Sequence, residues 1–277
     1  MENAQNVAWN KRAFEVLAID EETKDLLRAC VTCKLEADRS TDPIEGKGNG
    51  LIILLHGSPG TGKTMTAECV AELAEKPLYR VTCGDIGIDA PDVERYLTKV
   101  LTLGKIWGSV ILLDEAEVFL QQRNLHDLHQ NALVSIFLRL LEFHDGILIL
   151  TSNRVGTFDE AFKSRIQLAI HYAPLEKAQR RRIWRNLLEH IERMEPSMID
   201  FEELMDYIDE LSYSEMNGRQ IRNALTTARQ LAEWKKMRLN ISTLKHAIKL
   251  AGRFDTYLRA MNEDLSDEQI AREERIR

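Results

Sequence analysis

Residues 57–64 read Gly-Ser-Pro-Gly-Thr-Gly-Lys-Thr, which matches the pattern G-x-x-x-x-G-K-[ST] at every fixed position. Glycines lack a Cβ, so they let backbone N–H groups approach and surround an anion. In this pattern the lysine, Lys63, reaches the β- and γ-phosphates of a nucleotide, and the hydroxyl of Thr64 ligates Mg²⁺. An apolar run before the loop and a helical pattern after it argue against a glycine-rich turn that binds nothing. We therefore predict a site for ATP and Mg²⁺ formed by Gly57, Ser58, Pro59, Gly60, Thr61, Gly62, Lys63, Thr64 and Met65.

A second chemical feature is a pair of adjacent carboxylates, Asp114 and Glu115, which follows the apolar run Val110–Leu113. Neighbouring side chains at the end of a strand diverge, so one can face a metal while the other faces a water molecule. Asp114 would hold Mg²⁺ together with Thr64, and Glu115 would polarise the attacking water as a general base. The alternative is an ordinary surface pair on a loop, which is uncommon directly after a buried strand.

Three further polar residues are candidates for the same site. Asn153 follows the apolar run Ile147–Leu150, where it could orient the attacking water or touch the γ-phosphate, or only cap a turn. Arg165 precedes the last apolar run, where it could stabilise phosphate charge in a neighbouring subunit. Arg219 opens a predicted helix and could reach back over the nucleotide. For both arginines the alternative is an ordinary exposed side chain.

The elements that must position these residues alternate along the chain. Short apolar runs predict buried strands, and the stretches between them have helical periodicity. Strands that alternate with helices indicate a parallel sheet covered on both faces. A helix is expected before the sheet over residues 11–37, followed by a loop that is rich in turn formers. The predicted strands are Leu51–His56, Leu78–Cys83, Val110–Leu113, Ile147–Thr151 and Gln167–Tyr172, and the predicted helices between them are Lys63–Glu75, Asp92–Trp107 and Leu125–Phe143.

The pattern changes at Pro174, after which predicted helices replace the strands. They cover Leu175–Glu192, Phe201–Leu211, Gly218–Lys236 and Ile241–Met261. We therefore predict a large α/β domain over residues 1–174, a smaller all-helical domain over 175–261 and a charged tail over 262–277.

Composition narrows the class of protein. The 277 residues are 44% hydrophobic, enough for a packed core, and carry a net charge of −7. The acidic balance argues against broad binding of nucleic acid. The chain has neither an apolar run long enough to span a membrane nor a signal peptide at its start, so we expect an intracellular protein.

Cys30-x-x-Cys33 has the spacing of a metal or redox pair but lacks a second pair, so reduced thiols are the simpler interpretation.

From about Phe14 to Met261 the chain resembles the AAA branch of the AAA+ ATPases, which are P-loop NTPases, and within it a group of fungal proteins. GSPGTGKT resembles the Walker A loop, ILLDEA the Walker B strand and TSN the sensor 1 segment. Arg165 resembles the arginine finger, and Asn217-Gly218-Arg219 resembles sensor 2.

This resemblance implies a sheet of strand order 5-1-4-3-2 with nucleotide bound between the sheet domain and a helical lid. It also implies a homohexameric ring in which Arg165 acts in trans, and ATP turnover that remodels a protein substrate. Three features differ from the usual pattern of the family, and one is Arg219, because most members lack an arginine at the sensor 2 position. The segment before the last strand offers Arg165 alone, and the stretch Gly84–Asp89 lacks the aromatic residue of many pore loops, a part for which Ile86 or Ile88 could substitute.

Two other functions remain open on the sequence. A helicase loader or a clamp-loader-like ATPase would act on nucleic acid, although the acidic balance and the lack of a clear basic and aromatic stripe count against this function. A nucleotide-dependent scaffold would bind ATP without turnover, although the intact pair of Asp114 and Glu115 counts against that function.

Overall fold

The computed structural model describes residues 7–36, 50–82, 86, 89–123, 127–154 and 158–261. They form two compact units, which are described separately. The first comprises Met1–Ser58 and Lys63–Tyr172, and the second comprises Pro59–Gly62 and Ala173–Arg277. The predicted loop after residue 37, Cys83, most of the predicted pore-loop stretch and the charged tail lie outside the described residues.

A five-stranded parallel sheet forms the centre of the first unit, as predicted. Its order is β2-β3-β4-β1-β5, which confirms the expected order 5-1-4-3-2. The parallel register brings the carboxyl ends of β1, β3 and β4 to one edge, because Leu55 pairs with Thr151 and Leu113 with Leu150. The strands are β1 Leu51–Gly57, β2 Leu78–Thr82, β3 Val110–Asp114, β4 Ile147–Ser152 and β5 Leu168–Tyr172.

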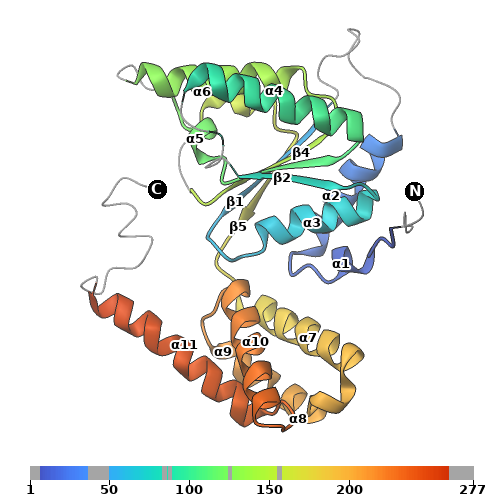
Figure 1. Ribbon diagram of the computed structural model, residues 1–277, viewed down its shortest axis with the longest axis vertical. Coiled ribbons are helices and arrows are strands. Elements are labelled where there is room, and N and C mark those ends of the chain that lie inside the picture. The colour runs from blue at the N-terminus through green and yellow to red at the C-terminus, as the bar shows by residue number, and fades with distance from the viewer. Residues whose placement is uncertain are drawn as a thin grey trace. The chain divides into compact units, whose positions relative to one another are not determined.

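Successive side chains of the strands enter two different cores, one on each face of the sheet. Ile111 and Leu113 of β3 belong to one core, while Val110 and Leu112 belong to the other. Helices α1, α2 and α3 cover the second of these faces, and α4, α5 and α6 cover the first (Figure 1). These helices are α1 Arg12–Glu15, α2 Glu21–Glu36, α3 Lys63–Ala74, α4 Ala90–Trp107, α5 Glu117–Leu120 and α6 Leu128–Glu142.

The single helix predicted over residues 11–37 is wrong, since two helices, α1 and α2, occupy this segment. Asp20 ends the break between them, because its carboxylate accepts a hydrogen bond of 2.7 Å from the N–H of Thr23 in the first turn of α2. This bond lowers the pKa of Asp20. Phe14 and Leu17 are buried on one side of the break and Leu27 on the other. Tertiary burial of these side chains therefore overrides a continuous helical pattern.

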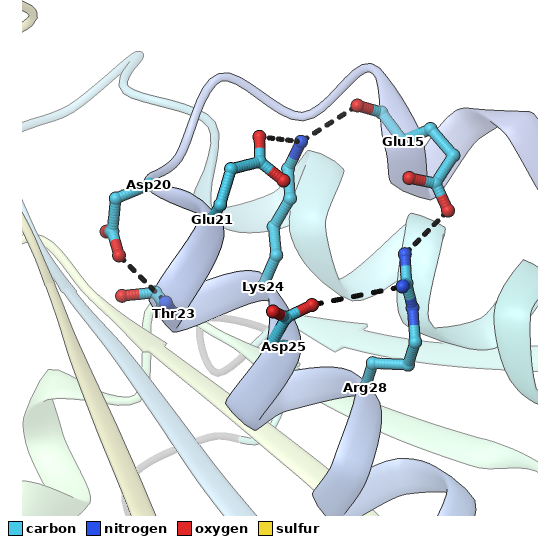
Figure 2. A network of polar contacts seen from close by, with 7 residues as sticks. All are labelled: Glu15, Asp20, Glu21, Thr23, Lys24, Asp25 and Arg28. Carbon is cyan, nitrogen blue, oxygen red and sulfur yellow. Dashed lines mark hydrogen bonds and ion pairs between the residues drawn. The ribbon is translucent and has the colours of Figure 1, made fainter.

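A buried lysine ties α1 to α2 (Figure 2). The ammonium of Lys24, whose side chain is 1% exposed, donates to the backbone carbonyl of Glu15 at 2.8 Å and lies 3.3 Å from the carboxylate of Glu21. Arg28 on the next turn of α2 pairs with the carboxylate of Glu15 at 2.6 Å. The last carbonyl of α1 thus accepts a hydrogen bond from a cation, and a positive charge stabilises the negative, C-terminal end of a helix.

Between Lys177 and Met261 the second unit is helical, which confirms the predicted helical region. Its core collects apolar side chains around Trp184, Leu188 and Ile221, all fully buried. The helix predicted over Phe201–Leu211 is divided at Tyr207 into two short helices. The helices of this unit are α7 Lys177–Met194, α8 Phe201–Asp206, α9 Ile208–Tyr213, α10 Gly218–Trp234 and α11 Ile241–Met261. A search of the described residues for a helix that could cross a membrane finds none.

His144 is a buried titratable group on the sheet unit, just beyond the end of α6. Its Nε2 lacks a hydrogen-bond partner among the described residues, and Gly50 and Gly146 leave the space that its ring and backbone fill. Burial lowers the pKa of His144 to about 4, while the charge of Asp145 opposes this shift and those of Lys34 and Lys105 add to it. The folded protein therefore keeps this imidazole neutral.

We expect the stability of the sheet unit to fall between pH 6.5 and about 4 because of His144. In that window the unfolded chain binds a proton at this imidazole and the folded chain does not. The buried, neutral His144 therefore makes its full contribution to the free energy of unfolding above pH 6.5, and this contribution is lost as the pH falls. A shift of this size is worth about 3 kcal/mol. Urea unfolding should show that the free energy of unfolding of the parent falls more steeply with decreasing pH than that of the His144→Leu variant. The same change at the exposed His190 is the control, and a parallel pH profile for His144→Leu and its parent would contradict the assignment.

Candidate active site

The phosphate-binding pattern lies directly after β1, at the carboxyl edge of the sheet. Gly57 ends this strand with φ 131°, and a Cβ there would lie 2.1 Å from the carbonyl oxygen of Tyr172 on β5. The N–H of Ser58 donates to that same oxygen at 3.2 Å. Only glycine fits this approach, because both the space and the φ angle exclude a side chain. The sheet therefore fixes where the loop begins.

Lys63 and Thr64 begin α3, so their backbone N–H groups lie at the positive end of a helix. The Lys63 ammonium donates to the carbonyls of Gly57 and Ser58, each at 2.7 Å, and the residue is 6% exposed. These bonds hold the ammonium against the loop. Met65 follows on the same helix and is 47% exposed.

Asp114 ends β3 with a carboxylate that other side chains hold on both oxygens. Its Oδ1 accepts from the hydroxyl of Thr151 at 2.5 Å and lies 3.4 Å from the hydroxyl of Thr64. Its Oδ2 pairs with the guanidinium of Arg80 at 2.5 Å. The predicted metal ligands Thr64 and Asp114 are thus brought together. Carboxylate and hydroxyl oxygens suit Mg²⁺, so this donor set fits the predicted ion.

Arg80 and Thr151 were missed as site residues when the sequence was considered alone. Arg80, Asp114 and Thr151 come from the adjacent strands β2, β3 and β4. Each side chain lies on the sheet face that α3 covers, the face to which Leu112 and Ile149 also contribute. A charged residue inside an apolar strand was the available signal for Arg80. For Thr151 the signal was its even spacing from Ile147 and Ile149, which predicts the same face.

Glu115 has a left-handed backbone conformation, with φ 59°. Such a conformation is uncommon for residues other than glycine and costs about 1 kcal/mol or more, so the surrounding structure must hold it in place. Its N–H donates to the hydroxyl of Thr151 at 3.0 Å, and its side chain is exposed. The backbone turn points the two adjacent carboxylates in different directions, with Asp114 buried and Glu115 open to solvent.

Asn153 lies just past the end of β4, where its backbone N–H donates to the carboxylate of Glu117 at 2.5 Å. Glu117 opens α5 and was given no role from the sequence. The carboxylate joins the segment that follows β3 to the segment that follows β4, and it fixes the backbone of Asn153 beside the two acidic residues.

Arg165 lies at the end of the sheet where the strands begin, opposite the end that carries the phosphate-binding loop. It precedes β5, whose first residue Leu168 pairs with Ile53 near the start of β1. Its guanidinium donates to the carbonyl of Ala161 at 2.9 Å and lies 3.4 Å from the carboxylate of Glu142. Because β1 has seven residues and a strand rises about 3.3 Å per residue, the two ends are about 20 Å apart. Arg165 is therefore separated from the loop of its own chain by the length of a strand.

The tip of the loop, Pro59–Gly62, groups with the helical unit, as does Arg219. Gly60 lies against the start of α10, where a Cβ would come within 2.6 Å of the Asn217 side chain. Asn217 caps this helix, because its side chain accepts from the N–H of Gln220 at 2.8 Å. The N–H of Arg219 donates to the Gly60 carbonyl at 3.3 Å. Thr61 in this segment is 8% exposed, and Gly62 has φ 112°.

His56 precedes the loop and is kept neutral by its surroundings. Burial lowers the pKa of His56, and electrostatic interaction with His171 and then with Lys63 lowers it further. The His56 and His171 rings lie 5.0 Å apart. At neutral pH the loop therefore receives its positive charge from Lys63 and the start of α3 rather than from this imidazole.

Comparison with known proteins identifies both parts of the chain. Residues 53–173 match the family model "ATPase family associated with various cellular activities (AAA)", and residues 175–265 match "Fungal AAA+ ATPase lid domain". The human ATPase family AAA domain-containing protein 3B is 30% identical over 147 residues, which are 50% of this chain and 23% of that protein. The chain spans about half the length of other curated relatives that it matches, 49% of one and 54% of another.

Solved structures share the fold. The crystal structure of the FIGL-1 AAA domain covers 94% of this chain, and the match covers 92% of that domain, with a TM-score of 0.64 and 20% sequence identity. The same domain in complex with ADP has a TM-score of 0.62 and 19% identity and covers 89% of each chain. Three observations agree: two family models match consecutive stretches of the chain, the sheet has the expected strand order, and the second unit is helical. The chain belongs to the AAA family, with an AAA ATPase domain followed by a fungal AAA+ lid domain.

Proposed function

We propose that this AAA ATPase hydrolyses ATP with Mg²⁺ at the carboxyl edge of its sheet and couples turnover to the remodelling of a protein in a homohexameric ring. The loop Gly57–Met65 would bind the phosphates, with the ammonium of Lys63 moving from the carbonyls of Gly57 and Ser58 to the phosphate oxygens. Thr64 and Asp114 would hold Mg²⁺, which neutralises phosphate charge when bound. The ADP complex of the FIGL-1 AAA domain supports nucleotide binding by this fold.

Glu115 would act as the general base on the attacking water. Its exposed carboxylate extends from a turn whose backbone is held by Thr151, so the side chain can reach solvent next to the metal ligands without displacing Asp114. Asn153, fixed by Glu117, would orient the same water or touch the γ-phosphate. Arg219 would contact phosphate from the lid, a role supported by the bond between its backbone and Gly60 of the loop.

The position of Arg165 carries the proposal of a ring. A strand's length, about 20 Å, separates it from the loop of its own chain, which exceeds the reach of an arginine side chain. Its cation is held by Glu142 and the Ala161 carbonyl at the far edge of the sheet. If Arg165 stabilises phosphate charge, it must therefore do so in the site of a neighbouring copy.

Remodelling would need residues that grip a polypeptide, and one candidate from the sequence is excluded. Ile86 is 6% exposed and packs in the core with Val81 and Val93, so it does not present a side chain to a substrate. Ile88 lies outside the described residues.

Mixing two inactive variants tests whether Arg165 acts in trans. We expect Arg165→Ala and Lys63→Met to be inactive separately, because each leaves every site incomplete. In mixed rings an Arg165→Ala subunit keeps its own loop and receives Arg165 from a Lys63→Met neighbour. Random mixing in equal amounts should restore about a quarter of the parent's phosphate release, since that combination occurs at one in four interfaces of a head-to-tail ring.

A double variant carrying both changes is the control, since mixing it with Arg165→Ala leaves no complete site. Size analysis of Glu115→Gln with and without Mg²⁺-ATP should show assembly when nucleotide is bound. Full activity of Arg165→Ala alone, or a species that stays monomeric with nucleotide bound, would contradict the ring.

A further inference from the structure

One residue of β4, Thr151, makes hydrogen bonds to three consecutive residues of the segment that carries both acidic groups. Its hydroxyl donates to the Asp114 carboxylate at 2.5 Å and accepts from the N–H of Glu115 at 3.0 Å. Its backbone carbonyl accepts from the N–H of Ala116 at 2.8 Å. Thr151 is 2% exposed and Asp114 is 6% exposed, so these bonds are shielded from water.

We propose that the Thr151 hydroxyl is a positioning group that sets the orientation of Asp114 toward the metal and the backbone of Glu115 toward the attacking water. The inference rests on the proposed hydrolysis of ATP at this site and adds a residue to it. Thr151 itself would touch neither nucleotide nor metal.

The geometry at Asp114 supports this role. A hydroxyl has one proton to donate, and here it goes to Oδ1, which is also the oxygen 3.4 Å from the Thr64 hydroxyl. With Arg80 on Oδ2, both oxygens are engaged, so the plane of the carboxylate cannot rotate freely. Hydrogen bonds to a metal-binding carboxylate orient it and tune its affinity for the metal.

The geometry at Glu115 adds a second, independent reason. The left-handed backbone at this residue, φ 59°, is unfavourable for a side chain with a Cβ. The bonds from Thr151 to the N–H groups of Glu115 and Ala116 hold the turn in place. Removing the hydroxyl leaves the first of these N–H groups without its acceptor and lets the turn relax, which would move the Glu115 carboxylate away from the water that it polarises.

Thr151→Val tests the hydroxyl alone, because valine keeps the shape and the strand preference of threonine. The matched control is Thr243→Val, which removes a buried hydroxyl that bonds to Asn240 in the helical unit. Thr151→Ser returns the hydroxyl without the methyl group. If Thr151→Val fails to fold, Thr151→Ala removes the same hydroxyl with a smaller side chain, and the same result is expected.

The first measurement is the Mg²⁺ concentration that half-saturates binding of a fluorescent ATP analogue, with each change made in a Glu115→Gln background so that turnover does not interfere. The second is kcat and KM for ATP with Glu115 intact. We expect Thr151→Val to need about tenfold more Mg²⁺ and to lose kcat by about tenfold to a hundredfold, with a smaller change in KM. Thr151→Ser should recover most of the Mg²⁺ affinity and most of kcat, and Thr243→Val should match the parent in both quantities.

Equal Mg²⁺ dependence and kcat in Thr151→Val and an active parent would overturn the inference and leave the proposed hydrolysis standing. So would a Thr151→Ser variant as impaired as Thr151→Val, because packing of the methyl group would then explain the loss. A folded parent that neither binds nor hydrolyses Mg²⁺-ATP would overturn the proposed function, and this inference with it.

Discussion

Glu115→Gln is expected to lower the rate of phosphate release by about a hundredfold or more while leaving the affinity for Mg²⁺-ATP within about threefold of the parent. Glutamine has nearly the same shape as glutamate but cannot accept a proton. The Glu115 side chain is exposed, and its backbone N–H, which Thr151 holds, is unaffected by the change. Binding depends on the loop, Lys63 and Asp114, which the substitution does not touch. Steady-state release of phosphate and equilibrium binding of a fluorescent ATP analogue measure the two quantities separately.

The control for Glu115→Gln is the same change at Glu202, an exposed residue of α8 in the other unit. It removes one negative charge without altering the sheet edge, so it should leave turnover unchanged. If Glu115→Gln hydrolyses ATP at the parent's rate, Glu115 is not the base. If instead both variants and the parent bind ATP without releasing phosphate, even when assembled, the chain acts as a nucleotide-dependent scaffold.

Lys63→Met should weaken the binding of Mg²⁺-ATP by about a hundredfold or more. The ammonium lies at the start of α3 and bonds to the carbonyls of Gly57 and Ser58, so it can turn to phosphate oxygens with little movement of the loop. Loss of one charge-assisted contact in a largely buried site costs about 2–5 kcal/mol, and this range includes the ~2.7 kcal/mol that corresponds to a hundredfold. Methionine keeps the unbranched stem and removes only the charge. Titration calorimetry with Mg²⁺-ATP measures the effect.

Lys76→Met is a closely matched control for this loss. The Lys76 ammonium also donates to a backbone carbonyl, that of Gly108, at 3.1 Å, but it lies on the segment after α3 rather than in the loop. Both variants lose a bond between an ammonium and a carbonyl, so any general effect on folding should be shared. Equal affinities for Mg²⁺-ATP in Lys63→Met and Lys76→Met would show that Lys63 does not bind the phosphates.

Local patterns in the sequence were sufficient to predict the elements that carry the phosphate loop and the acidic pair. Residues 57–64 and the pair after Val110–Leu113 are contiguous, so type and spacing alone indicate both the chemistry and the strand end on which it lies. The alternation of apolar runs and helical patterns likewise predicted a parallel sheet followed by helices. The strand order followed from the resemblance to the AAA family and not from the patterns themselves.

Helix boundaries that depend on tertiary contacts could not be predicted in the same way. The segment 11–37 has helical periodicity throughout, yet it breaks before Asp20, because Phe14 and Leu27 must both enter the core beneath the sheet. The ammonium of Lys24 then satisfies the carbonyl that the break leaves at Glu15. The choice between one helix and two depends on a surface to pack against, which the periodicity of the segment does not contain.

Contiguous motifs in the sequence identify the residues that carry chemistry, since local spacing sets their order along one strand or one helix. Which distant residues meet them depends on how the strands pair in the folded protein. Arg80, Asp114 and Thr151 are far apart in the chain, and they converge because three adjacent parallel strands are in register and their side chains share one face. The same register sends Arg165 to the opposite edge. Strand pairing depends on hydrogen bonds between segments, and a slip of one residue would turn every one of these side chains to the other face.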